Sequence, residues 1–272
     1  MTSITIIGLG WLGEPLALHL LEKGYYVKGS TTSPEKLAGL QSKGIETALL
    51  KFNPDPEGMG FLPLFETDVL FVNIPPRSRT VPEGFYAEQI KFVKELAVKS
   101  KVKKIIFVSS TSVYPDWNRK VDESLPLTLE NSGSPGILRA EQILQSEKSY
   151  DLSIIRFGGL LGVDRIPGRY FSGKTYVTGD SPVNYIHQVD AVRLSSWIIE
   201  NSIWNETFNG VAPLHPMRKD VYEKNARELG FAPPMSYADD GESMWKEISA
   251  DKILTTGFQF QIPDPLDFWY RP

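Results

Sequence analysis

Three glycines near the start of the chain have a spacing that suits contact with a phosphate group. Gly8, Gly10 and Gly13 form a G-x-G-x-x-G pattern between an apolar run and a helix-period segment. In such a turn the first glycine permits the tight bend, the second lets the backbone approach a pyrophosphate, and the third lets the helix pack closely on the strand. We therefore predict that the amides of Trp11 and Leu12 point at phosphate oxygens at the positive end of the helix. The alternative is a glycine-rich turn without a ligand.

The second predicted strand, Tyr26–Ser30, does not end in a carboxylate. Thr31, Thr32 and Ser33 follow it, and Lys36 lies one helical turn further on. An acid at this point would bind the adenosine ribose of NAD, whereas hydroxyls, a helix N-terminus and a lysine can hold the 2′-phosphate of NADP. The sequence therefore predicts a nicotinamide dinucleotide cofactor, with NADP preferred over NAD. The alternative is an ordinary helix cap with a solvated lysine.

Two further strand ends carry candidate site residues. Asn73, Ile74 and Pro75 follow the fourth predicted strand, where they are expected to lie along the cofactor. They can equally be loop punctuation. Ser110 follows a buried strand at the carboxyl edge of the predicted sheet, where ligands bind in such folds. It is the candidate catalytic residue, and the alternative is a turn serine that satisfies backbone groups.

The elements that position these residues alternate between apolar strands and helices. Strands that are apolar throughout and separated by helices indicate a parallel sheet covered on both faces. The predicted fold is α/β, a Rossmann-type doubly wound parallel sheet, with a flavodoxin-like fold as the alternative. Strands are predicted at 3–7, 26–30, 46–51, 68–74, 104–109 and 152–157, and helices at 14–23, from 33–34, at 85–100 and at 137–148.

The pattern loosens after Phe157, where glycines and prolines become frequent. We expect a dinucleotide-binding domain over 1–157, completed by 185–211, and a smaller C-terminal substrate lobe over 158–184 and 212–272. Arg165 and Arg169 lie in the glycine-rich stretch, where they could grip an anionic substrate. A solvated loop is the alternative.

Composition narrows the class of protein. The chain has 272 residues, a net charge of -4, no cysteine and three scattered histidines. This argues against nucleic-acid binding and against a metal site. No apolar run is long enough to span a membrane, and the N-terminus lacks the features of a signal peptide. We expect a soluble cytoplasmic protein with a small-molecule substrate, and its oligomeric state stays open.

Several segments resemble the extended short-chain dehydrogenase/reductases, the NAD(P)-dependent nucleotide-sugar epimerase and dehydratase group. SSTSVY at 109–114 is similar to the segment of that family in which the catalytic Ser/Thr matches Ser110. NYIHQVD at 184–190 is similar to its N-x-I-H-v-x-D, and further similar segments lie at 121–126, 156–162 and 208–211. The resemblance implies a nucleotide-sugar-like substrate and places Ser112, Asn184 and His187 among the candidate substrate-binding residues. For His187 the alternative, a structural hydrogen-bonding role, is favoured.

One departure affects the chemistry that can be carried over. The family uses a Tyr-x-x-x-Lys pair, and counting back from Glu141 puts Gly133 and Ile137 at those positions. Such a pair matters because the lysine lowers the pKa of the phenol so that it can exchange a proton with the substrate. The chain thus resembles an atypical branch of the family. We predict an oxidoreductase or epimerase-like enzyme, and the alternative is a non-catalytic NADP(H)-binding sensor.

Overall fold

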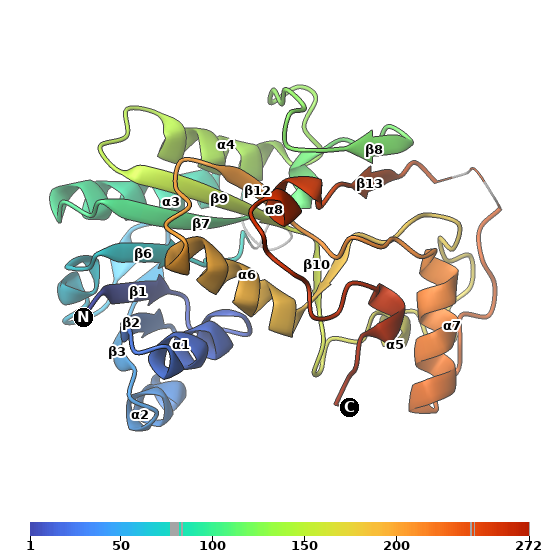
Figure 1. Ribbon diagram of the computed structural model, residues 1–272, viewed down its shortest axis with the longest axis horizontal. Helices are drawn as coiled ribbons and strands as arrows, with labels where there is room; N and C mark the ends of the chain where they lie inside the picture. Colours follow the sequence, from blue (N-terminus) through green and yellow to red (C-terminus); the bar gives the residue numbers. More distant parts are fainter. Residues whose placement is uncertain (77–81, 83, 240, 242, 272) are drawn as a thin grey trace. The chain divides into compact units, whose positions relative to one another are not determined.

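One seven-stranded sheet organises the part of the chain that the computed structural model describes, residues 1–76, 82, 84–239, 241 and 243–271 (Figure 1). Its order is β12-β9-β7-β6-β1-β2-β3, and the neighbours from β3 to β7 pair in parallel. The strands are β1 (Ser3–Ile7), β2 (Tyr26–Thr31), β3 (Glu46–Leu49), β6 (Val69–Val72), β7 (Lys104–Ser110), β9 (Asp151–Phe157) and β12 (Thr207–Gly210).

The parallel arrangement follows from the composition of the strands. Every residue of β6 is buried, as are residues 4–7 of β1, so both faces of these strands need cover. The connecting helices supply it, which confirms the predicted Rossmann-type doubly wound α/β fold. The helices are α1 (Gly13–Glu22), α2 (Pro34–Ser42), α3 (Phe85–Lys99), α4 (Pro135–Gln145), α5 (Pro167–Tyr170), α6 (Gln188–Glu200), α7 (Arg218–Leu229) and α8 (Asp251–Thr255).

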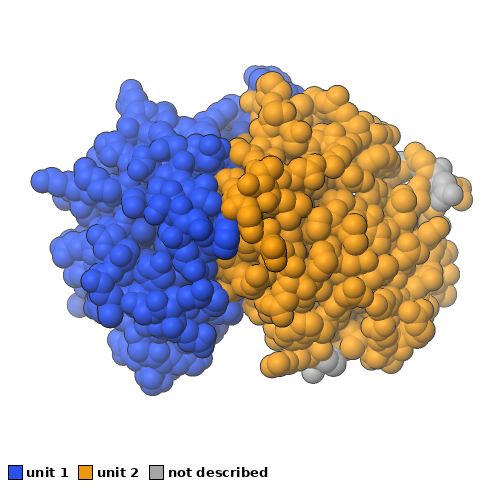
Figure 2. Space-filling model, viewed as in Figure 1, with its two compact units in different colours: residues 1–113, 128–155, 195–207 blue, residues 114–127, 156–194, 208–272 orange. Residues whose placement is uncertain are grey.

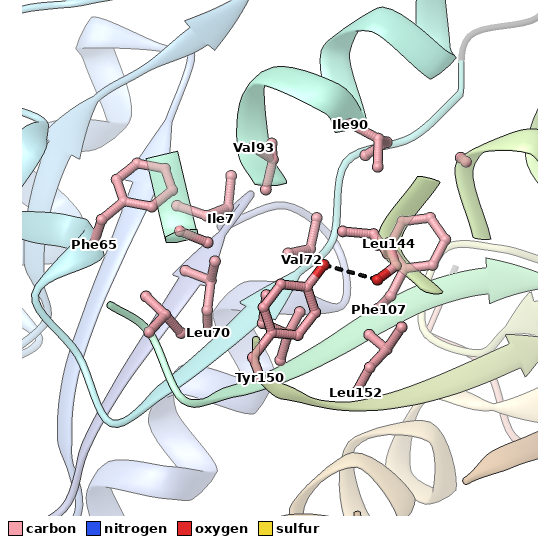
Figure 3. Packing of buried hydrophobic residues seen from close by; sticks show 14 of the residues in the cluster. Ile7, Phe65, Leu70, Val72, Ile90, Val93, Phe107, Leu144, Tyr150 and Leu152 are labelled. Atoms are coloured by element: carbon pink, nitrogen blue, oxygen red, sulfur yellow. Dashed lines mark hydrogen bonds between the residues drawn. The ribbon is translucent and has the colours of Figure 1, made fainter. Parts of the chain in front are cut away.

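The main apolar core lies between the sheet and helices α3 and α4 (Figure 3). Strand residues such as Leu70 and Phe107 pack there against Ile90 and Val93 of α3 and Leu144 of α4. At its edge the hydroxyl of Tyr150 donates a hydrogen bond of 2.8 Å to the carbonyl oxygen of Leu144. The core therefore fixes α3 against the ends of β1 and β6.

One strand prediction was wrong in detail. The predicted strand at 46–51 is divided, because residues 51–52 leave the main sheet and form β4 (Lys51–Phe52), which pairs antiparallel with β5 (Pro56–Glu57). Three short 3₁₀ helices also occur within the described residues, at Leu62–Phe65, Thr111–Val113 and Pro265–Asp267.

The chain forms two compact units (Figure 2). The first unit comprises residues 1–113, 128–155 and 195–207, and the second comprises residues 114–127, 156–194 and 208–272. The second unit contains two parallel strand pairs, β8 (Arg119–Val121) with β13 (Lys246–Ile248) and β10 (Gly159–Leu161) with β11 (Tyr185–His187). The domain boundaries expected from the sequence stay a prediction, because a compact unit need not be an independently folding domain. No helix among the described residues is long and apolar enough to cross a membrane.

Candidate functional site

A cavity of about 250 Å³ lies in the first unit, at the carboxyl ends of β1, β2 and β6. The strand order runs in opposite directions on the two sides of β1, which makes this edge the topological switch point where open α/β sheets bind ligands. The cavity brings together most of the predicted cofactor residues, namely Gly8, Gly10, Thr31, Thr32, Ser33, Lys36, Asn73, Ile74 and Pro75. Trp11, Leu12 and Gly13 are not part of its lining, and they lie at the start of α1.

The three glycines of the turn have different surroundings. A Cβ atom on Gly8, whose φ is +109°, would lie 2.5 Å from the carbonyl oxygen of Asn73. A Cβ atom on Gly13 would lie 2.1 Å from the carbonyl oxygen of Gly8. Both positions need glycine for the fold itself. Gly10 lines the cavity, and a Cβ atom there would meet no heavy atom within 4 Å. Gly10 therefore leaves open space that suits a bound pyrophosphate.

Hydrogen bonds hold the turn in place from both neighbouring strands. The side-chain amide of Asn73, which follows β6, donates to the carbonyl oxygen of Gly8 at 3.0 Å. On the other side, the amide of Gly8 donates to Oγ of Ser30 at 3.0 Å, and the amide of Leu9 donates to the carbonyl oxygen of Ser30 at 2.7 Å. The shape of the turn is thus fixed by protein contacts alone.

The end of β2 presents hydroxyl groups to the cavity. The side chain of Thr31 is 6% exposed, and its Oγ1 accepts a hydrogen bond from the amide of Ser33 at 3.2 Å. Ser33 donates its own hydroxyl to Glu35, which holds the pKa of that carboxyl below its usual value. Lys36 from α2 and Lys51 from β4 line the same cavity, and none of the described lining residues carries a carboxylate.

Ser110 ends β7 in the first unit, as predicted from its sequence position. Its Oγ accepts a hydrogen bond of 3.1 Å from the amide of Ser112, at the start of the 3₁₀ turn that follows. This bond fixes the position of the hydroxyl oxygen and does not consume its hydrogen. Ser110 is therefore positioned as a turn serine that can still donate to another acceptor.

Asn184 and His187 lie in the second unit, where backbone groups occupy their polar atoms. Asn184 donates its amide to the carbonyl oxygen of Lys246 at 2.9 Å and accepts from the amide of Ile248 at 2.8 Å. The amide of Val189 donates to Nδ1 of His187, so Nε2 carries the hydrogen and donates to the carbonyl oxygen of Trp269 at 3.0 Å. Burial lowers the pKa of His187. Their substrate-binding role stays a prediction.

Arg165 and Arg169 also belong to the second unit. Arg165 is half-buried, and its backbone exchanges two hydrogen bonds with Gly162. Arg169 is exposed, with its guanidinium 5.6 Å from the centre of the Phe231 ring. The two arginines thus share a unit with Asn184 and His187, whereas Ser110 and Ser112 lie in the first unit. Among the described residues no group of three or more His, Asp or Glu side chains could hold a metal ion.

Comparison with known proteins places the chain in a family. Residues 3–55 match the sequence family described as the NAD binding domain of 6-phosphogluconate dehydrogenase. Protein YeeZ of Escherichia coli (strain K12) is 32% identical over 269 residues, which cover 98% of each chain. The chain belongs to the family of YeeZ.

Two solved structures share its fold over nearly the whole length. The UDP-Glc/GlcNAc 4-epimerase of Campylobacter jejuni superposes with a TM-score of 0.78 at 16% identity, covering 98% of this chain and 96% of the epimerase. The human epimerase family protein SDR39U1, solved with NADPH, superposes with a TM-score of 0.72 at 15% identity, covering 96% of each chain. This YeeZ family member therefore has the Rossmann-type fold of these epimerase-family structures, which agrees with the resemblance inferred from its motifs.

Gly133 and Ile137, which the count back from Glu141 predicts in place of the tyrosine and lysine, both make structural contacts in this YeeZ family member. The amide of Gly133 donates to the carbonyl oxygen of Val113 at 3.1 Å. Ile137, in the first turn of α4, packs half-buried against the main core. Neither residue carries a titratable group, so no proton can be exchanged at these two positions.

Several residues that line the cavity were not predicted as site residues from the sequence. The sequence predicted a strand that ends at Lys51, and it gave no site role to Leu50, Lys51 or Phe52. Gln89 was predicted only as part of the helix at 85–100. One signal could have revealed Gln89. It follows Tyr86 by three residues and precedes Val93 by four, so it is a polar residue within the buried stripe of α3.

Tyr114 is the other tyrosine that could be considered as a proton donor, and it is wholly enclosed in the second unit. Its hydroxyl donates to Oδ1 of Asn209 at 2.9 Å and accepts from Nη1 of Arg156 at 2.8 Å. Burial raises the pKa of Tyr114 to about 12, although the nearby Arg156 opposes that shift. The hydroxyl is thus a buried structural link between two polar side chains.

We expect Tyr114→Phe to lower the free energy of unfolding by about 1–3 kcal/mol, because the change removes the hydrogen bonds of the Tyr114 hydroxyl to Asn209 and Arg156 in a buried place. Urea unfolding of the purified variant measures the loss. Tyr150→Phe is the control, since within the described residues that hydroxyl makes one hydrogen bond, to the carbonyl oxygen of Leu144, and a smaller loss is expected. Equal stability of Tyr114→Phe and wild type would show that the link contributes nothing.

Proposed function

We propose that this chain binds NADP(H) in the cavity of the first unit and uses it for hydride chemistry on an anionic, nucleotide-sugar-like small molecule. The observation that carries the proposal is the cavity at the switch point, which has open space above Gly10 and hydroxyls in place of a carboxylate at the end of β2. Further support comes from the structures that share the fold, one a UDP-sugar epimerase and one solved with NADPH.

The preference for NADP over NAD is argued from charge. Two lysines, Lys36 and Lys51, line the cavity beside Thr31, Thr32 and Ser33. Lys51 lies 3.8 Å from Glu57, and both side chains are about half exposed, so this ion pair is weak and can yield to a phosphate. A 2′-phosphate at this position would be attracted by two cations and would meet no carboxylate among the described lining residues.

Each residue of the proposed site has a defined task. When bound, the nicotinamide supplies or accepts the hydride. The turn from Gly8 to Gly13 holds the pyrophosphate by its backbone, and the end of β2 holds the phosphorylated ribose. Ser110, held in place by the amide of Ser112, donates its hydroxyl hydrogen to a substrate oxygen and polarises the bond that reacts. Ser112, Arg165, Arg169, Asn184 and His187 are proposed substrate contacts.

Thr31→Asp is expected to reverse the cofactor preference. Wild type should bind NADPH at least about tenfold more tightly than NADH, because Lys36 and Lys51 attract the 2′-phosphate that NADH lacks. About 1.4 kcal/mol of such attraction corresponds to a tenfold ratio of affinities. In the variant the new carboxylate repels the 2′-phosphate and accepts bonds from ribose hydroxyls, so NADH should bind more tightly. Calorimetric titration of both cofactors into both proteins gives the two ratios.

Paired lysine variants serve as the control. Lys51→Gln should weaken NADPH binding and leave NADH binding unchanged. Lys43→Gln should change neither, because Lys43 pairs with Glu14 at 2.6 Å and does not line the cavity. If wild type bound the two cofactors with equal affinity, the proposed preference for NADP would be wrong, whereas the proposed dinucleotide binding would not be contradicted.

The wider proposal is tested by adding NADPH, without and with carbonyl compounds and nucleotide sugars. Binding of NADPH followed by substrate-dependent oxidation supports it. Absence of binding of either dinucleotide would overturn it. Tight binding without turnover of any substrate would leave the cofactor site standing and remove the enzymatic part.

A further inference from the structure

The cavity of the first unit has a second end that the sequence motifs do not describe. Beyond the turn and the end of β2 it is lined by Leu50 and Phe52, by Ile74, and by Gln89 from α3. With the pyrophosphate on the glycine turn and the ribose at Thr31, as proposed above, this end is the part of the cavity left for the base of the adenosine half. The volume, about 250 Å³, is below the range of about 300–1,000 Å³ typical of whole-ligand pockets. It therefore suits one half of a dinucleotide.

Gln89 is buried and its amide has a fixed orientation. The side chain is 6% exposed, and Nε2 donates a hydrogen bond of 2.7 Å to the carbonyl oxygen of Phe52. Because that partner can only accept, the nitrogen must face it and Oε1 must point the other way. Within the described part of the chain no hydrogen bond reaches Oε1. A residue of the cavity wall thus carries an oriented and unused acceptor.

An acceptor in this place distinguishes one purine from another. Adenine carries a 6-amino group, which donates hydrogen bonds, whereas hypoxanthine carries an oxygen at the same position, which only accepts. Glutamine pairs with adenine through this amino group. Facing hypoxanthine, the same Oε1 would meet a second acceptor and both would stay unpaired, which is unfavourable in a buried site.

We propose that Gln89 selects the base of the cofactor, with its Oε1 accepting a hydrogen bond from the 6-amino group of adenine. Leu50, Phe52 and Ile74 supply apolar surface for the ring. Gln89 belongs to the buried stripe of α3, so the main core fixes its position before any ligand binds. This inference rests on the proposed binding of NADP(H) in the same cavity.

The test compares NADPH with its hypoxanthine analogue, deamino-NADPH, by titration into the full-length protein. Wild type is expected to bind NADPH about tenfold or more tightly than the analogue, as for one buried hydrogen bond. Gln89→Leu should weaken NADPH binding and leave binding of the analogue equal or improved, so that the ratio approaches one. Each ratio is measured on a single protein, so a change in the folded fraction cancels.

Gln41→Leu is the matched control. Gln41 also donates to a backbone carbonyl, that of Thr47 at 3.3 Å, in the same unit, and it does not line the cavity. This variant should keep the wild-type ratio.

Three results would overturn the inference. If Gln89→Leu weakened both ligands equally, Gln89 would have only a structural role. If wild type bound both ligands equally well, Gln89 would not read the base, although the proposed cofactor site would stand. If wild type bound neither NADPH nor NADH, the proposed function and this inference would fall together.

Discussion

Gly10→Val is expected to weaken NADPH binding by at least about a hundredfold, to below detection in calorimetric titration, while the protein stays folded. The branched side chain would occupy the space above the turn that the backbone leaves open for the pyrophosphate. The protein itself should tolerate the change, since a Cβ atom on Gly10 meets no heavy atom within 4 Å. The thermal midpoint should therefore stay close to that of wild type.

Variants of two other glycines serve as controls that distinguish a loss of NADPH binding from a loss of folding. Gly39 in α2 is exposed, has equally open surroundings and lies outside the cavity, so Gly39→Val should change neither binding nor midpoint. Gly13→Val should unfold the protein, because its Cβ would lie 2.1 Å from a backbone oxygen that cannot move away. Wild-type NADPH affinity in Gly10→Val would show that the phosphates lie elsewhere.

The sheet was predictable from the sequence because its signals are local. Strands β1 and β6 of the first unit are almost entirely apolar, and the glycine turn joins β1 to α1 within a few residues. The short strand pairs of the second unit gave no such signal. Strand β8 has three residues and pairs with β13, more than a hundred positions away in the sequence. A run of three residues shows no periodicity, and only tertiary folding brings its partner to it.

The candidate site divides along the same line. Gly8, Gly10 and Thr31 lie next to recognisable strand ends, and the cavity contains them. Lys51 and Gln89 line the cavity from β4 and α3. Packing in the core brings these two elements to the cavity, so no short sequence motif could identify the two residues. Motif similarity gave no information about the surroundings of Asn184, whose side-chain amide donates to the carbonyl oxygen of Lys246 and accepts from the amide of Ile248, both in β13.

The second large effect concerns proton transfer. By the correspondence predicted from the sequence, Gly133 and Ile137 take the places of the tyrosine and lysine, and neither can exchange a proton. General acid/base help is typically worth about 10²–10⁴-fold, so turnover should be slower by about that factor than in relatives that have the pair. The proton must then come from water, from the substrate or from another residue. Tyr114 is unsuited to this role because its hydroxyl is saturated by Asn209 and Arg156.

Ser110→Ala should therefore reduce the kcat of any substrate-dependent NADPH oxidation by about tenfold or more, since it removes the donor that polarises the substrate oxygen. Ser132→Ala is the control, because Ser132 is a turn serine of the same unit that accepts from the amide of Ser134 and donates to the carbonyl oxygen of Val113. If Ser110 were only a turn serine, the two variants would lose stability alike and keep the same kcat. NADPH binding should survive in both, because the proposed pyrophosphate contacts come from the backbone after β1. Fast turnover that requires Tyr114 and ignores Ser110 would contradict the assignment and place the proton donor in the second unit.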